Sequence, residues 1–336
     1  MITLKQIAEK AGVSYATVSD VVHNKWQKKG IASETRNRVM KIVKELDYKP
    51  NRIARSLVRH KTNMIGVKLP SLVYQYWTKV AIELEQAARE YDYHTFFSVP
   101  CDWQDEREEI IRLYEHQIDG FIISPRMTDK LQELYNWLSG KGMPFVFIGT
   151  KYTDKYPAVL DDNVSQARLA TEHLISLGHK KIAHICGSLG SVNGLGRKAG
   201  YEQAMRLAGL DIKEKYIVEG HFNIEDAYRA MKCLLEMDDK PTAVYCANDL
   251  MAIGAIKAIE QFSLRVPDDI AIVGHGDDIP FESFHRIPLT TIRQPIKQMT
   301  EIAVKMLIDI IEGKKPQRII VECSGELVIR KSCGQT

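Results

Sequence analysis

The sequence predicts a small all-α helix-turn-helix domain followed by a larger α/β domain with two doubly wound lobes. Three observations predict this arrangement. Two short helical segments with apolar faces open the chain, basic residues are concentrated in the same region, and short apolar runs then alternate with helical stretches in two successive series. With 336 residues, the chain is long enough for two or three domains with cores of their own.

The first element is a pair of short helices between Thr3 and Val22. Leu4, Ile7 and Ala11 recur at helical spacing, which gives the first helix one apolar face. Gly12 ends this helix, because glycine enters the left-handed region without steric cost, and Ser14 caps the second helix. The pattern predicts either a helix-turn-helix that reads DNA or an ordinary helical hairpin in a core.

Charge favours the DNA-binding interpretation. Residues 1–62 contain 14 lysines and arginines against 5 acidic residues, a net charge of +9, whereas the remaining 274 residues have a net charge of −6. A strongly basic module joined to a mildly acidic body is typical of a domain that binds phosphates, the alternative being a solvated basic face.

A third helix and a short fourth one complete the N-terminal region. Residues 33–46 have helical spacing, with Ser33 at the start. Pro50 breaks the chain after Tyr48 and suits the first turn of a new helix over residues 51–57. We therefore expect a DNA-binding domain over residues 1–49, a hinge helix and linker over 50–62, and a two-lobed domain over 63–336.

The two-lobed domain is expected from apolar runs that end in turn signals and alternate with helices. The expected strands are residues 65–69, 120–123, 145–148, 181–186, 243–246 and 270–273. A break near Asp162 and a return segment over residues 292–313 place one lobe at about 63–161 and 293–320, and the other at about 162–292 and 321–336. Ligands of such sheets bind at the carboxyl ends of the strands, so a small molecule should bind in the cleft between the lobes.

Candidate effector-binding residues follow from that placement. Aromatic faces combined with Arg, Asn and Asp side chains suit a sugar, and the candidates are Ser71, Tyr76, Trp77, Arg126, Asp162, Arg197, Phe222, Asn248 and Asp277. Some of these residues have a structural alternative. Asn248, like its neighbour Asp249, could cap the helix that follows, Tyr76 and Trp77 could be core aromatics, and Arg197 could form a structural ion pair.

Several motifs, taken in order along the chain, resemble the lactose-repressor (LacI/GalR) family of bacterial transcription regulators. They are AGVSYATVS (residues 11–19), YKPNRIARSL (48–57), LATEHLISLGHKKIA (169–183), RKAGYEQAM (197–205), ANDLMAIGA (247–255) and IPLTTIRQP (287–295). The resemblance implies a periplasmic-binding-protein-like effector domain, and it supports Arg197, Phe222, Asn248 and Asp277 as effector contacts.

The resemblance also implies which residues contact DNA. These are Thr3, Ser14, Tyr15, Ala16, Thr17, Ser19, Asp20, His23, Asn24, Lys28, Asn51, Arg52, Ala54 and Leu57. Leu57 would be an apolar wedge that opens a base step in the minor groove.

The chain departs from the family pattern at three places. Asp20 stands where the family usually has arginine, and a carboxylate can accept from cytosine but cannot donate to guanine. The loop over residues 24–33 is longer and contains Trp26 and three lysines. The segment GHGDDIP (274–280) has one additional residue, which leaves open whether Asp277 or Asp278 contacts the effector.

Other classes of protein are disfavoured. The segment 194–199 fits the GxGxxA pattern of NAD enzymes, but Gly194 lies eight residues after the expected strand instead of directly after it. We expect no catalytic residues, no cofactor and no metal site, because the ten histidines and six cysteines do not cluster. A solute-binding receptor would require a signal peptide and lack a basic head, and the sequence shows neither that leader nor a membrane span, which predicts a cytoplasmic location.

We therefore expect a homodimeric repressor that binds a pseudo-palindromic double-stranded DNA operator. Its operator affinity would be controlled by a small-molecule effector, a sugar or sugar derivative, bound between the lobes.

Overall fold

A computed structural model of the chain describes residues 2–48, 61–278 and 287–334. The chain divides into two compact units, Met1–Thr62 and Asn63–Thr336. The helix expected over residues 51–57 lies outside the described residues, as do its candidate DNA contacts Asn51, Arg52, Ala54 and Leu57.

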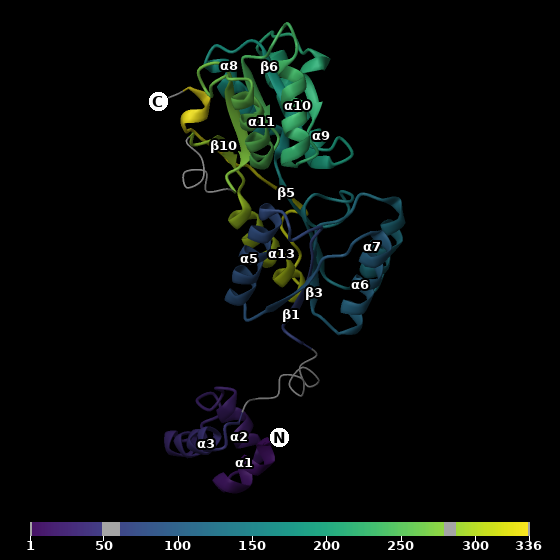
Figure 1. The fold of residues 1–336 in the computed structure, drawn as a ribbon. Coiled ribbons are helices and arrows are strands. Elements are labelled where there is room, and N and C mark those ends of the chain that lie inside the picture. Colours follow the sequence, from purple (N-terminus) through teal and green to yellow (C-terminus); the bar gives the residue numbers. More distant parts are fainter. Residues whose placement is uncertain (1, 49–60, 279–286, 335–336) are drawn as a thin grey trace. The chain divides into compact units, whose positions relative to one another are not determined.

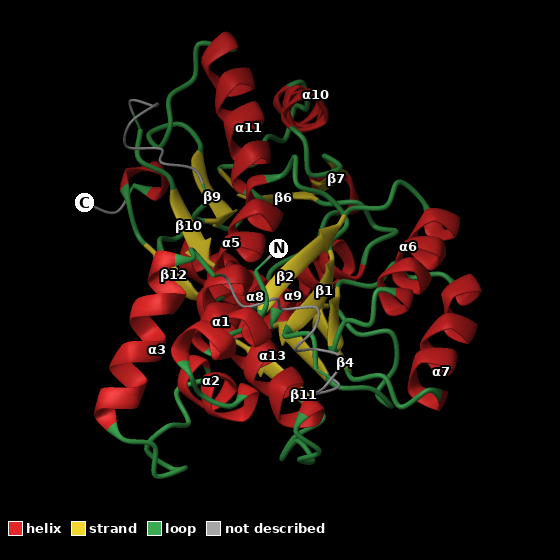
Figure 2. Cartoon of the chain, turned by 90° about the horizontal axis from the view of Figure 1, so that it is seen from below, coloured by secondary structure: helices red, strands yellow, loops and turns green. Residues whose placement is uncertain are grey.

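The first unit is a bundle of the helices α1 (Leu4–Ala11), α2 (Tyr15–Val22) and α3 (Ser33–Glu45) (Figure 2). Gly12 ends α1 in the left-handed region at φ 64°, and the Ser14 side chain caps α2 by accepting a hydrogen bond from the Thr17 amide. Both caps confirm the helix boundaries expected from the sequence. Apolar side chains from all three helices form the core: Ile7, Ala8, Ala11, Val18, Val21, Val39 and Ile42.

The structure adds two details about this unit. Ala32 is the residue that precedes α3, no side chain caps this helix, and Ser33 is its first residue. Trp26, in the long loop, packs against the core of the bundle. The loop is therefore anchored by its tryptophan, while Lys25, Lys28 and Lys29 are exposed.

The second unit contains two six-stranded sheets, which lie in separate lobes (Figure 1). In the first, the strand order is β11-β5-β4-β3-β1-β2 and all neighbours are parallel. In the second, the order is β12-β10-β9-β8-β6-β7, with β12 antiparallel to β10. The strands are β1 (Met64–Lys68), β2 (His94–Ser98), β3 (Gly120–Ile123), β4 (Phe145–Gly149), β5 (Ala158–Asp161), β6 (Ile182–Cys186), β7 (Ile217–Glu219), β8 (Ala243–Cys246), β9 (Ala271–Gly276), β10 (Thr290–Arg293), β11 (Ile320–Cys323) and β12 (Glu326–Val328).

Helices cover both faces of each sheet, as the doubly wound pattern predicts. In the first lobe, α5 and α13 pack on one face and α6 and α7 on the other, and Figure 1 shows the two pairs on opposite sides of β1 and β3. In the second lobe, α10 and α11 form one layer and α8 and α9 the other. The helices are α5 (Gln75–Glu90), α6 (Trp103–Glu115), α7 (Gln132–Gly140), α8 (Asn163–Ser176), α9 (Val192–Leu207), α10 (Ile224–Leu235), α11 (Asp249–Gln261) and α13 (Ile296–Ile311), with short 3-10 turns at Asp129–Leu131, Glu214–Tyr216 and Lys331–Cys333.

The chain passes between the lobes three times. It leaves the first sheet after β5, returns after β10, and crosses again between β11 and β12. Because β11 pairs with β5, residues up to Cys323 belong to the first lobe, so the last crossing falls slightly later than the sequence had placed it.

Candidate functional site

A cavity of about 320 Å³ lies between the lobes at the carboxyl ends of the strands. The first lobe contributes the beginning of α5 and the loop before it. The second lobe contributes α9 and the loop before it, the loop after β7, the beginning of α11 and the end of β9. Its described lining residues are Tyr74, Gln75, Tyr76, Trp77, Ser188, Asn193, Arg197, His221, Phe222, Asn248, Asp249, Leu250, His275, Asp278 and Gln294. Five of the nine effector-binding candidates, Tyr76, Trp77, Arg197, Phe222 and Asn248, thus meet at one site.

Arg197 lines the cavity and also contacts groups of both lobes. Its Nε donates to Asn163 Oδ1 at 2.7 Å, one terminal nitrogen donates to the Ala247 carbonyl, and the other lies 3.9 Å from Asp161 Oδ2. Only 5% of Arg197 is exposed. Arg197 therefore has the structural role that the sequence left open, and it also lies at the cavity.

Phe222 and Asn248 are fixed by their own neighbours. The Phe222 ring lies against Gly187, where an added Cβ would come within 1.9 Å of the ring, so a larger residue here would displace the ring. The Arg197 guanidinium lies 5.9 Å from the centre of the Phe222 ring. Asn248 caps α11 through the Met251 amide and donates to the Phe222 carbonyl at 3.1 Å. Asn248 therefore both caps a helix and lines the cavity.

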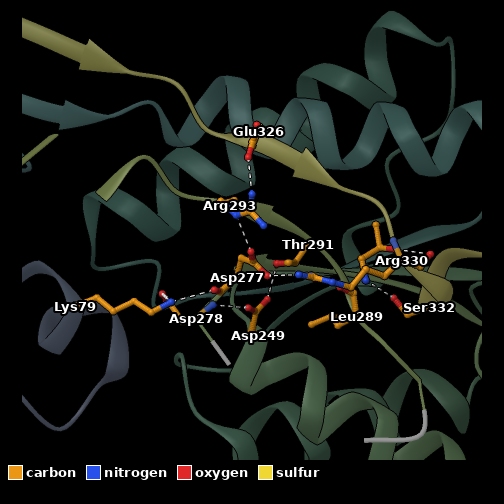
Figure 3. Close-up of polar contacts among 11 residues, drawn as sticks. Lys79, Asp249, Asp277, Asp278, Leu289, Thr291, Arg293, Glu326, Arg330 and Ser332 are labelled. Atoms are coloured by element: carbon orange, nitrogen blue, oxygen red, sulfur yellow. Dashed lines mark hydrogen bonds and ion pairs between the residues drawn. The ribbon is translucent and has the colours of Figure 1, made fainter. Parts of the chain in front are cut away.

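The structure corrects the choice of Asp277. Its two carboxylate oxygens accept from Arg293 Nε at 2.7 Å and Arg330 Nη2 at 2.8 Å (Figure 3), and Asp277 is absent from the described lining of the cavity. Burial alone would raise the pKa of Asp277, but the two arginines outweigh it and hold the pKa below its usual value. Asp278, the alternative that the sequence left open, lines the cavity instead.

Asp249 is a buried carboxylate beside Asp278. It accepts from the Thr291 hydroxyl at 2.6 Å and from the Asp278 amide at 3.2 Å (Figure 3). Burial raises its pKa to about 6, the Thr291 hydrogen bond opposes this shift, and the Asp278 charge adds to it. Asp249 is the first residue of α11, whereas Asn248 is the cap.

Tyr76 and Trp77 are both core aromatics and cavity residues, the two roles that the sequence left open for them. They pack against the core of the first lobe and also line the cavity. Their rings meet edge to face, with centroids 4.8 Å apart, so each ring holds the other in position.

Three other candidates lie away from this cavity. Ser71 accepts from the Val73 amide, and Asp162 caps α8 by accepting from the Ser165 amide. Arg126 donates to the carbonyls of Pro100 and Cys101, and it lines a neighbouring hollow that shares Trp77 and Asn193 with the cavity. None of the three is among the described lining residues of the cavity, so their role as effector contacts stays a prediction.

The lining residues that sequence reasoning missed include Ser188, Asn193, His275 and Gln294. Gln294 directly follows β10 at the crossing between lobes, and His275 lies within GHGDDIP. Their position next to a strand end was the available signal, but polar residues next to strand ends are common.

In the first unit, the candidate DNA contacts divide into caps and accessible side chains. Thr3 and Ser14 cap α1 and α2, and the Thr17 hydroxyl pairs with that of Ser14 at 2.9 Å. His23 ends α2, and its Nδ1 lies 2.7 Å from the Ser19 carbonyl. Besides the exposed caps Thr3 and Ser14, the exposed candidates are Tyr15, Ala16, Asn24 and Lys28, and Ser19 and Asp20 are partly exposed.

The rival interpretation as an NAD enzyme fails on geometry. Gly194 lies inside α9, well after the end of β6, and an added Cβ there would meet the Ser188 carbonyl oxygen at 2.2 Å. The absence of a side chain at Gly194 therefore allows the loop after β6 to pack closely against α9.

Within residues 2–48, 61–278 and 287–334, no group of three or more His, Cys, Asp or Glu side chains could hold a metal ion. No described helix is long and apolar enough to span a bilayer.

Comparison with known proteins identifies the family. Residues 3–51 match the model of bacterial regulatory proteins of the lacI family, and residues 171–333 match the periplasmic binding protein-like domain. The HTH-type transcriptional repressor PurR of Pasteurella multocida is 36% identical over 339 residues, covering 99% of this chain and 98% of that protein. The chain belongs to the lacI family.

Further relatives agree with this membership. PurR of Histophilus somni strain 2336 is 35% identical, covering 99% of each chain. The structure of the Lac repressor dimer bound to operator and the anti-inducer ONPF has a TM-score of 0.87 and 28% identity, covering 99% of each chain. The complex of the transcriptional regulator CelR with cellobiose has a TM-score of 0.73 and 27% identity, covering 99% of this chain and 100% of that one. This lacI-family chain is thus a DNA-binding transcription regulator, and the relatives compared are transcriptional repressors or regulators.

Proposed function

We propose that the chain is a homodimeric repressor whose affinity for a pseudo-palindromic operator is set by a small-molecule effector. The observation that supports this most is the cavity between the lobes, because both lobes contribute side chains to it. A ligand that contacts both lobes favours one relative arrangement of them, and it can shift that equilibrium only by its difference in affinity for the two arrangements.

The effector we propose is a sugar or sugar derivative. Rings from both lobes, Trp77 and Phe222, offer faces for the C–H surface of a pyranose or furanose. Asn193, Asn248 and Asp278 offer donors and acceptors for hydroxyl groups. The cavity volume lies at the lower end of the usual range for small-molecule sites, which suits a small sugar.

A nucleobase is the second candidate. Much of the polar lining is already hydrogen-bonded inside the protein: Asn248 to Met251 and Phe222, and Asp249 to Thr291. A flat aromatic ligand needs fewer polar partners than a sugar with several hydroxyl groups, and it can stack on the same rings.

On the DNA side, we propose that α2 enters the major groove and presents Tyr15, Ala16, Ser19 and Asp20 to base edges. Residues 51–57, including Leu57, would occupy the minor groove at the centre of the operator. The basic residues of the first unit support contacts with phosphates.

Two measurements test this function. Melting temperatures of the full chain are recorded with D-galactose, D-ribose, cellobiose, ribose 5-phosphate, adenine and guanine, since a ligand that binds only the folded state raises the melting temperature. Each stabilising compound is then added to an operator-binding assay. If a compound stabilises the protein but leaves operator affinity unchanged, the cavity is not an effector site.

Salt dependence tests the DNA contacts separately. The logarithm of the operator association constant should fall steeply and linearly with the logarithm of salt concentration, because each neutralised phosphate releases a counterion. A flat plot would contradict phosphate binding by the first unit.

A further inference from the structure

Three aromatic side chains from neighbouring strands of the second sheet form a buried column. His184 of β6 stacks on Tyr245 of β8, with ring centroids 4.7 Å apart and planes 7° from parallel. The Tyr245 hydroxyl lies 2.9 Å from Nδ1 of His275 on β9. His184 and Tyr245 have no exposed surface, and 1% of His275 is exposed.

The two histidines differ in their position relative to the cavity. Among the described residues, neither Nε2 atom has a hydrogen-bond partner. His275 lines the cavity between the lobes, whereas His184 is absent from the described lining. An unpaired buried nitrogen at the edge of a cavity is a group that a ligand can satisfy.

Both rings are neutral near pH 7. Burial lowers the pKa of His184 to about 4. Burial also lowers the pKa of His275 well below its usual value, and the positive charge of Arg197 adds to this effect. Each ring therefore has one N–H and one acceptor nitrogen.

The neighbours of Nδ1 determine which nitrogen has the hydrogen. His184 Nδ1 lies 3.0 Å from the Tyr245 carbonyl, which can only accept, so His184 holds its hydrogen on Nδ1. The Tyr245 hydroxyl has one hydrogen bond in the described structure, to His275. If this hydroxyl accepted from Nδ1, its own buried hydrogen would have no acceptor there. Tyr245 therefore donates, Nδ1 of His275 accepts, and the hydrogen of His275 is on Nε2.

We propose that Tyr245 holds His275 with its Nε2–H donor at the cavity, and that this donor binds an acceptor atom of the effector. His275 would then be a specificity-determining residue. It favours ligands that place a hydroxyl, carbonyl or unprotonated ring nitrogen at this point, and it disfavours those with a methyl or ammonium group there, because the buried N–H would stay unpaired. The inference rests on the proposed function of the cavity as the effector site.

The first experiment needs no ligand. The full chain is labelled with ¹⁵N-histidine, and the imidazole nitrogens are observed by NMR at pH 7, assigned with His184→Phe and His275→Phe. We expect opposite tautomers, with the hydrogen on Nδ1 in His184 and on Nε2 in His275, and a mixture for His275 in Tyr245→Phe. A hydrogen on Nδ1 of His275, or an imidazolium, would overturn the proposal.

The second experiment tests binding with the six compounds named above. For each compound that binds the wild type, His275→Phe should weaken affinity about 10- to 100-fold. His275→Gln, which keeps an N–H at the end of a planar side chain, should restore at least part of this loss. His184→Phe is the matched control, since it alters the same stack away from the cavity and should bind like the wild type.

The outcomes separate the two proposals. If His275→Phe and His184→Phe lost ligand affinity equally, the aromatic column would serve only for packing, and the inference would be overturned. If none of the six compounds binds the wild type, the proposed effector classes fail, while the NMR measurement still decides whether His275 presents a donor. Circular dichroism and the melting temperature of each variant show whether it is folded.

Discussion

Lys79 Nζ, on α5 of the first lobe, lies 3.2 Å from Asp278 Oδ1, which follows β9 of the second lobe. The same ammonium group donates to the Asp277 carbonyl at 3.0 Å (Figure 3). Burial raises the pKa of Asp278, and the Lys79 charge opposes that shift. Because Asp278 also lines the cavity, one carboxylate takes part both in a contact between the lobes and in the proposed effector site.

The two adjacent aspartates should respond differently to the same substitution. Asp278→Asn should lower effector affinity about 10- to 100-fold, because it removes a charged acceptor at the cavity. Asp277→Asn should instead lower the free energy of unfolding by about 1–3 kcal/mol through its bonds to Arg293 and Arg330. Calorimetric titration and urea unfolding of both variants check this, with Lys79→Met as the control for loss of the ion pair. The reverse pattern would restore Asp277 as the effector contact.

Arg197→Ala should destabilise the two-lobed domain strongly. The substitution leaves Asp161 as a buried carboxylate without its cation, and breaking a buried pair in this way costs roughly 3–5 kcal/mol. Urea unfolding measures the loss. Arg168→Ala, which removes an exposed pair with Glu172, is the matched control and should cost at most about 1 kcal/mol. A folded Arg197→Ala protein of wild-type stability that fails to respond to effector would show that Arg197 acts only as a ligand contact.

The raised pKa of Asp249 predicts a loss of stability as pH rises. Between its usual pKa near 4 and its folded-state pKa of about 6, the folded chain retains a proton that the unfolded chain has released. The contribution of Asp249 to the free energy of unfolding should therefore fall across this pH interval by up to about 3 kcal/mol, and it should level off at higher pH. The difference in unfolding free energy between wild type and Asp249→Asn, measured from pH 4 to 7.5, tests this. A difference independent of pH would show that Asp249 has an ordinary pKa.

Asp20→Arg should change base preference within each operator half-site more than it changes non-specific affinity. Asp20 is partly exposed on α2, and a side chain that reads a base edge determines specificity. Binding to a randomised operator library measures the preference. Lys28→Ala is the contrasting variant, expected to weaken binding to all sequences alike. If Asp20→Arg raises affinity uniformly, Asp20 faces the DNA backbone.

The local elements were largely accessible from the sequence. Gly12 and Ser14 define the turn between α1 and α2, because left-handed backbone and capping depend on residue type and nearest neighbours. The strands over residues 120–123 and 243–246 have the expected bounds, since buried parallel strands are continuous apolar runs. The edge strand β2 was missed, because its exposed and half-buried residues lack such a run.

The sequence by itself thus determined the helix-turn-helix, the doubly wound lobes and the position of the cleft, all of which follow from local periodicity and from where strands end. Only the tertiary structure decided which side chains line the cleft. Asp277 and Asp278 are chemically identical neighbours. Arg293 and Arg330, which come from a different strand and loop, bind Asp277, whereas Asp278 faces Lys79. The role that we propose for His275 depends on Tyr245, thirty residues away in the chain. Hydrogen-bond partners of this kind depend on sheet order and register, which residue spacing along the chain does not specify.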